Sequence, residues 1–249
     1  MTLFEIFAHV VVFAAAFLQS ATGIGFGIIA GPIILILIDS HAAVQVTMGL
    51  SFAVSLALAP TLVAHVDRQM LKRLGLGTLI GLPLGLLVFW AVSLPVLKFL
   101  AMLAVAFMAW TVARASQNTT GAQPTSTNTA DLGIGVVSGA MSTALAMPGP
   151  AAAARLTALA LPKLTVRATV LLLMVISYVG ALVAQAGFIG IERQTIEAVA
   201  WMLPAALIGT FAGRLFVSRI DEQLFRRIIT AVLVITALGL LLDVGRGFI

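Results

Sequence analysis

The feature that most constrains this chain is the recurrence of apolar stretches about 20 residues long, the length a helix needs to cross the hydrocarbon core of a bilayer. Six of them are uninterrupted: residues 43–64, 74–92, 96–112, 166–188, 196–216 and 225–242. Hydrophobic residues make up 61% of the chain and charged residues only 9%, against about a quarter charged in soluble domains. The sequence therefore excludes a water-soluble globule and predicts an all-α, multi-pass integral membrane protein.

Two further apolar segments, residues 3–38 and 132–161, are too long for one span and are broken by Gly, Ser, Thr and Pro. The two segments align without a gap, which pairs Ser20 with Ser138, Gly31 with Gly149 and Pro32 with Pro150. This self-similarity indicates an internal repeat. We expect a first membrane repeat over residues 1–115, a polar linker over 116–131 and a second repeat over 132–249.

Two topologies fit these segments, and the distribution of Lys and Arg discriminates between them. If both broken segments cross the membrane, the repeats are parallel and the cations divide eight to six between the two faces. If both are re-entrant hairpins, the repeats are inverted and the cations divide eleven to three. The positive-inside rule favours the second arrangement, with the linker cytoplasmic and both termini outside. A single kinked, tilted span over residues 132–161 remains the alternative.

The breaks are the strongest candidates for a binding site, because irregular backbone at membrane depth must be buried in protein or line a cavity. Interrupted segments at matching positions of two repeats mark the midplane site of many transporters. The helix that follows each break begins with unpaired N–H groups at the positive end of its dipole, which favours an anion. We expect Pro148 at the first helical position of the second break, where a missing N–H costs nothing.

The candidate substrate-binding residues are those of the two breaks and one nearby arginine: Gln19, Ser20, Thr22, Gly23, Gly25, Phe26, Gly27, Ser138, Ser142, Thr143, Pro148, Gly149, Pro150 and Arg155. Each has a plainer alternative. Small residues in apolar helices often serve close helix packing, and Gln19 and Gln185 could form interhelical hydrogen bonds instead of lining a site. Arg155 could snorkel to the headgroups instead of contacting an anion.

Other classes of function lack their residues. The chain has no cysteine, and it carries no P-loop, GxSxG or HExxH motif. The three histidines lie near predicted span ends, and no carboxylate lies in the middle of a span. We therefore expect that the protein is not an enzyme and that it binds no metal, no other cofactor and no nucleic acid. The expected partners are the lipid bilayer and a small anion; a coupling ion (proton or sodium) and a homodimer remain open.

The run QSATGIGFGIIAGP at residues 19–32 and the run GVVSGAMSTALAMPGPAAAARL at residues 135–156 resemble the paired glycine motifs of the TauE/SafE sulfite exporter family, also called the 4-toluene sulfonate uptake permeases. The length, the duplicated layout and the central polar linker are also similar to that family. The resemblance implies movement of small sulfur-containing anions, such as sulfite or sulfoacetate, across the bacterial inner membrane. A passive anion channel, a small carboxylate transporter and a membrane scaffold without transport activity are the alternatives.

Overall fold

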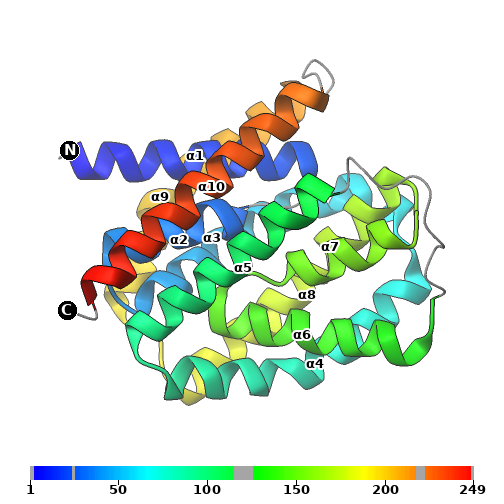
Figure 1. Cartoon of the computed structure of the whole chain (residues 1–249), viewed down its shortest axis with the longest axis horizontal. Coiled ribbons are helices and arrows are strands. Elements are labelled where there is room, and N and C mark those ends of the chain that lie inside the picture. Colours follow the sequence, from blue (N-terminus) through cyan, green and yellow to red (C-terminus); the bar gives the residue numbers. More distant parts are fainter. Residues whose placement is uncertain (1–2, 24–25, 115–125, 217–221, 248–249) are drawn as a thin grey trace.

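The computed structural model describes residues 3–23, 26–114, 126–216 and 222–247, and its regular elements there are all helical (Figure 1). The elements before residue 115 are α1 (Leu3–Thr22), α2 (Phe26–Ile38), α3 (Ala42–Leu62), the short 3-10 helix η1 (Val63–His65), α4 (Arg68–Ala91) and α5 (Leu94–Arg114). Those after residue 125 are α6 (Asn128–Leu145), α7 (Gly149–Ala158), α8 (Lys163–Phe188), α9 (Arg193–Phe216) and α10 (Glu222–Gly247). The predicted all-α class is confirmed.

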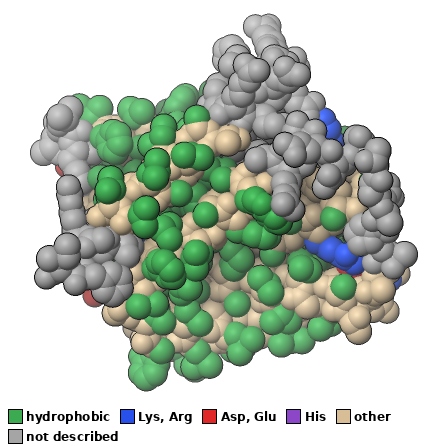
Figure 2. All heavy atoms as spheres, in the orientation of Figure 1, with side chains coloured by type: hydrophobic (Ala, Val, Ile, Leu, Met, Phe, Trp, Pro, Cys, Tyr) green, Lys and Arg blue, Asp and Glu red, His purple; other side chains and the backbone are tan. Residues whose placement is uncertain are grey.

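Five of these helices, α3, α4, α5, α8 and α9, are long and apolar enough to cross a membrane, the first together with η1. They correspond to five of the six predicted spans. The sixth falls in α10, where Thr230–Leu242 is a shorter apolar stretch. Hydrophobic side chains cover much of the surface (Figure 2), with Trp90 and Leu215 each 74% exposed. Such a surface is suited to lipid, and the chain is a helical membrane protein.

Each broken segment folds as a pair of helices. The two outer ends of each pair lie at the same end of the molecule. In the second pair, Arg155 Nε of α7 lies 2.9 Å from Asp131 Oδ1 in the first turn of α6. In the first pair, His9 of α1 contacts the carbonyl of Trp201, in the first half of α9. Ser40, which follows α2, lines a cavity together with Thr195, which also belongs to α9. Each break is therefore the tip of a helical hairpin.

The two hairpins open at opposite ends of the molecule. The end where Asp131 contacts Arg73, near the start of α4, is called the linker end. The end where the cavity is lined by Ser40, Glu192 and Phe89, near the finish of α4, is called the cavity end. In Figure 1 the start of α1 and the end of α10 lie at the left. The end of α5 and the start of α6, which flank the linker, lie toward the right.

Helices from the two halves of the chain pack on each other in an exchanged pattern. The most extensive contacts are between α4 and α6 and between α1 and α9, which are equivalent pairs if α1 corresponds to α6 and α4 to α9. The equivalent helices α3 and α8 pack on each other, as do α5 and α10. The linker is shorter than expected at one end, because α6 already begins at Asn128. Residues 115–125 lie outside the described part.

Candidate functional site

The first break is organised by Gln19, which is fully buried near the end of α1. Its Oε1 accepts a hydrogen bond from the N–H of Phe26 at 3.1 Å, and its Nε2 donates to Ser55 Oγ of α3 at 3.0 Å. Gln19 thereby caps α2 and satisfies one of the N–H groups predicted to face a ligand. Ser20 Oγ donates to the carbonyl of Thr210 at 2.8 Å. The side chain of Thr22 and all of Gly25 lie outside the described residues.

The second break is a left-handed helix end. Ala146 has a φ of 57°, and its N–H donates to the carbonyl of Ser142 at 2.9 Å, as in the αL cap motif; the N–H of Met147 donates to the carbonyl of Met141 at 3.1 Å. Pro148 precedes α7 as its N-cap, whereas the sequence placed it at the first helical position; Pro150 occupies the first turn. The difference is physically small, since neither position requires the N–H that proline lacks.

The second break meets the second arm of the first hairpin, so the structure brings part of both breaks together. A Cβ atom on Gly27 would overlap the carbonyl oxygen of Ala146, and only glycine permits so close an approach. The same oxygen accepts a hydrogen bond at 3.0 Å from the hydroxyl of Tyr178 in α8. Tyr178 is fully buried and is the only tyrosine in the chain. Sequence reasoning missed it, because a tyrosine in an apolar run carries no motif.

Several buried polar atoms near this junction have no hydrogen-bond partner within the protein. They are Ser138 Oγ and Ser142 Oγ in α6, and Ser177 Oγ and Gln185 Oε1 in α8, two helices that pack against each other. Gln185 Nε2 donates to the carbonyl of Thr143 at 2.7 Å, and Ser51 lies beside the Tyr178 hydroxyl. Buried polar groups left unpaired are costly, so this cluster is suited to a polar ligand.

The first break also contains a cation that the sequence analysis counted only toward topology. Arg167, on the second turn of α8, donates from Nη2 to the carbonyl of Ser20, and its Nε is buried without a partner. Gly23 has a φ of +79°, and a Cβ atom there would overlap the Arg167 side chain. The break is therefore shaped around this arginine. The sequence offered one indication that Arg167 has a special position: it aligns with Gln45 in the similar runs VQVT and VRAT.

Arg155 has a partner that neither sequence alternative included. Asp131, fully buried in the first turn of α6, receives hydrogen bonds from Arg155 Nε at 2.9 Å, Arg73 Nη1 at 3.3 Å and Ser126 Oγ at 2.6 Å. Burial acts to raise the pKa of Asp131, but the hydrogen bonds from Ser126 and both arginines outweigh it and hold that pKa below its usual value. The charges of two arginines and one carboxylate thus form a closed network at the linker end.

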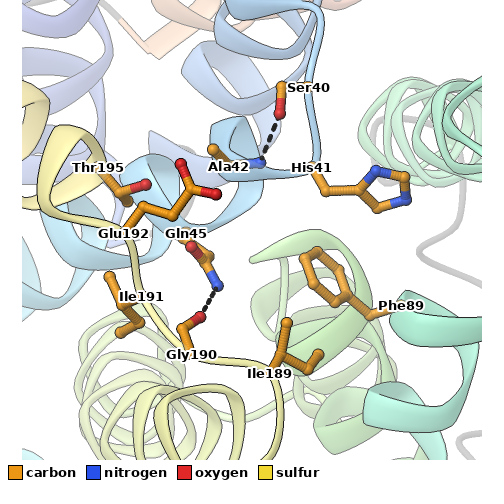
Figure 3. Close-up of a pocket in the computed structure, with 10 residues that line it drawn as sticks. All are labelled: Ser40, His41, Ala42, Gln45, Phe89, Ile189, Gly190, Ile191, Glu192 and Thr195. Atoms are coloured by element: carbon orange, nitrogen blue, oxygen red, sulfur yellow. Dashed lines mark hydrogen bonds between the residues drawn. The ribbon is translucent and has the colours of Figure 1, made fainter.

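A second polar region lies at the cavity end, where a cavity of about 300 Å³ is enclosed by the loops before α3 and α9 and the finish of α4 (Figure 3). Gln45 Nε2 donates to the carbonyl of Gly190 at 3.0 Å, and the Glu192 carboxylate lies near Ala42. The described lining includes this carboxylate and no Lys or Arg. The cavity is therefore electrostatically unsuited to hold an anion.

Searches of curated proteins and of solved structures find no match. A family model, described as sulfite exporter TauE/SafE, matches residues 8–240. This range runs from within α1 to within α10. The chain therefore belongs to the TauE/SafE sulfite exporter family.

Proposed function

We propose that this protein is a secondary transporter for sulfur oxyanions or organosulfonates in the bacterial inner membrane. Family membership establishes the broader class, a membrane transporter of sulfur-containing anions such as sulfite. In the proposal the substrate binds near the midplane, between the hairpin tips of two inverted repeats. Alternating access exposes this site first to one face and then to the other.

The observation that carries the proposal is the group of buried hydroxyls without a hydrogen-bond partner on α6 and α8, the helix that ends at the second break and the helix that carries Tyr178: Ser138, Ser142 and Ser177. Hydroxyls donate hydrogen bonds to oxyanions without carrying a charge of their own. The N-terminus of α7 adds the positive end of a helix dipole. Together they stabilise an anion while avoiding the desolvation cost of a cation buried at membrane depth.

Re-entrant hairpins and inverted repeats are supported by the opposite directions in which the two hairpins open. The charges agree with this topology. Arg68, Arg73, Arg155 and Lys163 lie on the elements that meet at the linker end, while Lys98 and Arg193 lie at the cavity end. In Figure 2 the visible Lys and Arg side chains gather toward one end of the molecule. By the positive-inside rule the linker end is cytoplasmic.

Counterflow in proteoliposomes tests the proposal. Vesicles loaded with unlabelled sulfite should accumulate labelled sulfite from outside, and excess external sulfoacetate or taurine should compete. Ser142→Ala removes an unpaired hydroxyl and should weaken this exchange. Thr61→Ala is the matched control, since Thr61 is exposed and its hydroxyl bonds only within α3. Accumulation of organic cations in place of anions would overturn the proposal.

The alternatives give different results in the same vesicles. A passive anion channel conducts without stimulation by substrate on the opposite side. A small carboxylate transporter exchanges carboxylates but not sulfite, and a scaffold exchanges neither. Adding proton or sodium ionophores identifies the coupling ion, because only the coupled gradient changes net uptake when it collapses.

A further inference from the structure

We propose that Arg167 and Arg214 form a second anion-binding site at the first break, where the transported anion is received from the linker end before it reaches the buried serines of α6 and α8. This inference rests on the proposed function, since it assigns an access site for the same substrate. Arg214 lies in the last turn of α9, and Arg167 lies on the second turn of α8. Neither residue was among the sequence candidates for substrate binding.

The first argument is the incomplete pairing of Arg167. Its side chain is half-buried, and its Nε has no partner although the atom is shielded from solvent. One terminal nitrogen donates to the carbonyl of Ser20. A guanidinium has five N–H donors in a planar fork, which matches two oxygens of a carboxylate, sulfonate or sulfite at once. An oxyanion would therefore use donors that the protein leaves unpaired.

The second argument is that two positive charges lie on the same part of the first break. Gly213, the residue before Arg214, packs against Ser20, whose carbonyl accepts the hydrogen bond from Arg167. Within the described part of the chain, the ion pairs involve Arg73, Lys98, Arg155 and Arg193, and neither Arg167 nor Arg214 takes part in one. Two neighbouring guanidiniums without a counter-charge disfavour each other, and an anion between them removes that repulsion.

The third argument is the contrast with two other places in the same molecule. At the linker end, Arg73 and Arg155 are also neighbours, but the buried Asp131 neutralises part of their charge. At the cavity end, the repeat equivalent of Arg167 is the uncharged Gln45, in a cavity that also contains Glu192. Among the residues that the structure describes, positive charge without a paired carboxylate thus distinguishes the first break from both other places.

Calorimetric titration of the purified protein with sulfite tests the assignment. We expect Arg167→Gln to raise Kd about 10- to 100-fold, because it removes hydrogen bonds to a charged ligand. Arg167→Lys should lie between, since it keeps the charge and loses the fork. Arg214→Gln should raise Kd by less, because its side chain is exposed. Arg193→Gln is the control: Arg193 is exposed, lies at the cavity end and pairs with Glu197.

A double-mutant cycle separates ligand binding from a structural role. If both arginines hold one anion, the effects of Arg167→Gln and Arg214→Gln on Kd are not additive. If Arg167 only secures the carbonyl of Ser20, Arg167→Gln lowers the melting temperature while Arg214→Gln leaves Kd unchanged, and the assignment is overturned. Wild-type exchange of sulfite with unaltered Kd in both variants would overturn this site alone. A wild-type protein that neither binds nor exchanges anions would overturn the proposed function itself.

Discussion

At the scale of single residues, Gly27 determines how closely the two hairpins approach. Replacing it with Ala places a methyl group against the carbonyl oxygen of Ala146 and 3.5 Å from the Tyr178 hydroxyl. We expect overpacking that costs about 1–3 kcal/mol and a loss of sulfite exchange. Gly133→Ala is the control, because a Cβ there meets nothing within 4 Å. Normal exchange by Gly27→Ala would show that the contact between the hairpins is not required.

Asp131 is the residue whose neutralisation should be most costly at the linker end. Asp131→Asn leaves Arg73 and Arg155 without their carboxylate in a site where the aspartate is fully buried. Removing one partner of a buried ion pair costs about 3–5 kcal/mol. We expect a clear fall in melting temperature in detergent, measured by tryptophan fluorescence. Glu197→Gln breaks an exposed pair and should leave that temperature unchanged; equal effects of the two substitutions would contradict this account.

At the scale of elements, the contact between α4 and α6 depends on glycines that let the two backbones touch. Gly77, Gly81 and Gly85 recur every fourth residue on α4, and a Cβ on each would overlap a carbonyl oxygen of α6. This is the small-residue packing that membrane helices use in place of a hydrophobic driving force.

Gly81→Ala should therefore separate the second hairpin from α4, lower the melting temperature and reduce exchange. On the same helix, Gly75→Ala meets nothing within 4 Å and should be neutral or slightly stabilising, because Ala favours helix. The comparison is made by thermal unfolding of both variants in the same detergent. A Gly75→Ala protein as unstable as Gly81→Ala would place the cause in helix propensity and not in the contact.

At the scale of the whole molecule, the two hairpins should give the membrane topology a specific signature. The chain has no native cysteine, so single cysteines report their own accessibility. Asn128→Cys should react with an impermeant reagent only from the cytoplasm, and Gln194→Cys only from the opposite face. Glu5→Cys and Ser40→Cys should share the face of Gln194, because both arms of the first hairpin end there. Labelling of positions 5 and 40 from opposite faces would disprove the re-entrant arrangement.

The sequence alone was sufficient for the class of protein, five of the spans and the existence of one break in each long segment. These follow from local properties, since the length and apolarity of a run indicate a span and clustered Gly, Ser, Thr and Pro favour a break, although Pro32 and Pro83 lie within the continuous helices α2 and α4. The family resemblance could also be recognised from the sequence, because each glycine motif is a contiguous run of residues. Two of the expected interruptions were wrong, because α2 continues through Gly31 and Pro32 and α6 continues through residues 138–143. Other errors at this level were small: Pro148 is the N-cap of α7, and α6 starts within the expected linker.

The tertiary structure decided which side chains meet across helices that are distant in sequence. Asp131 lies beside Arg155 and Arg73, Gln19 reaches Ser55, and Arg167 lies across Gly23. No local pattern predicts these contacts. The local sequence around a polar residue in an apolar helix is the same whether that residue faces lipid, a neighbouring helix or a ligand. Only packing determines which carboxylate neutralises which arginine, and therefore where positive charge remains for an anion.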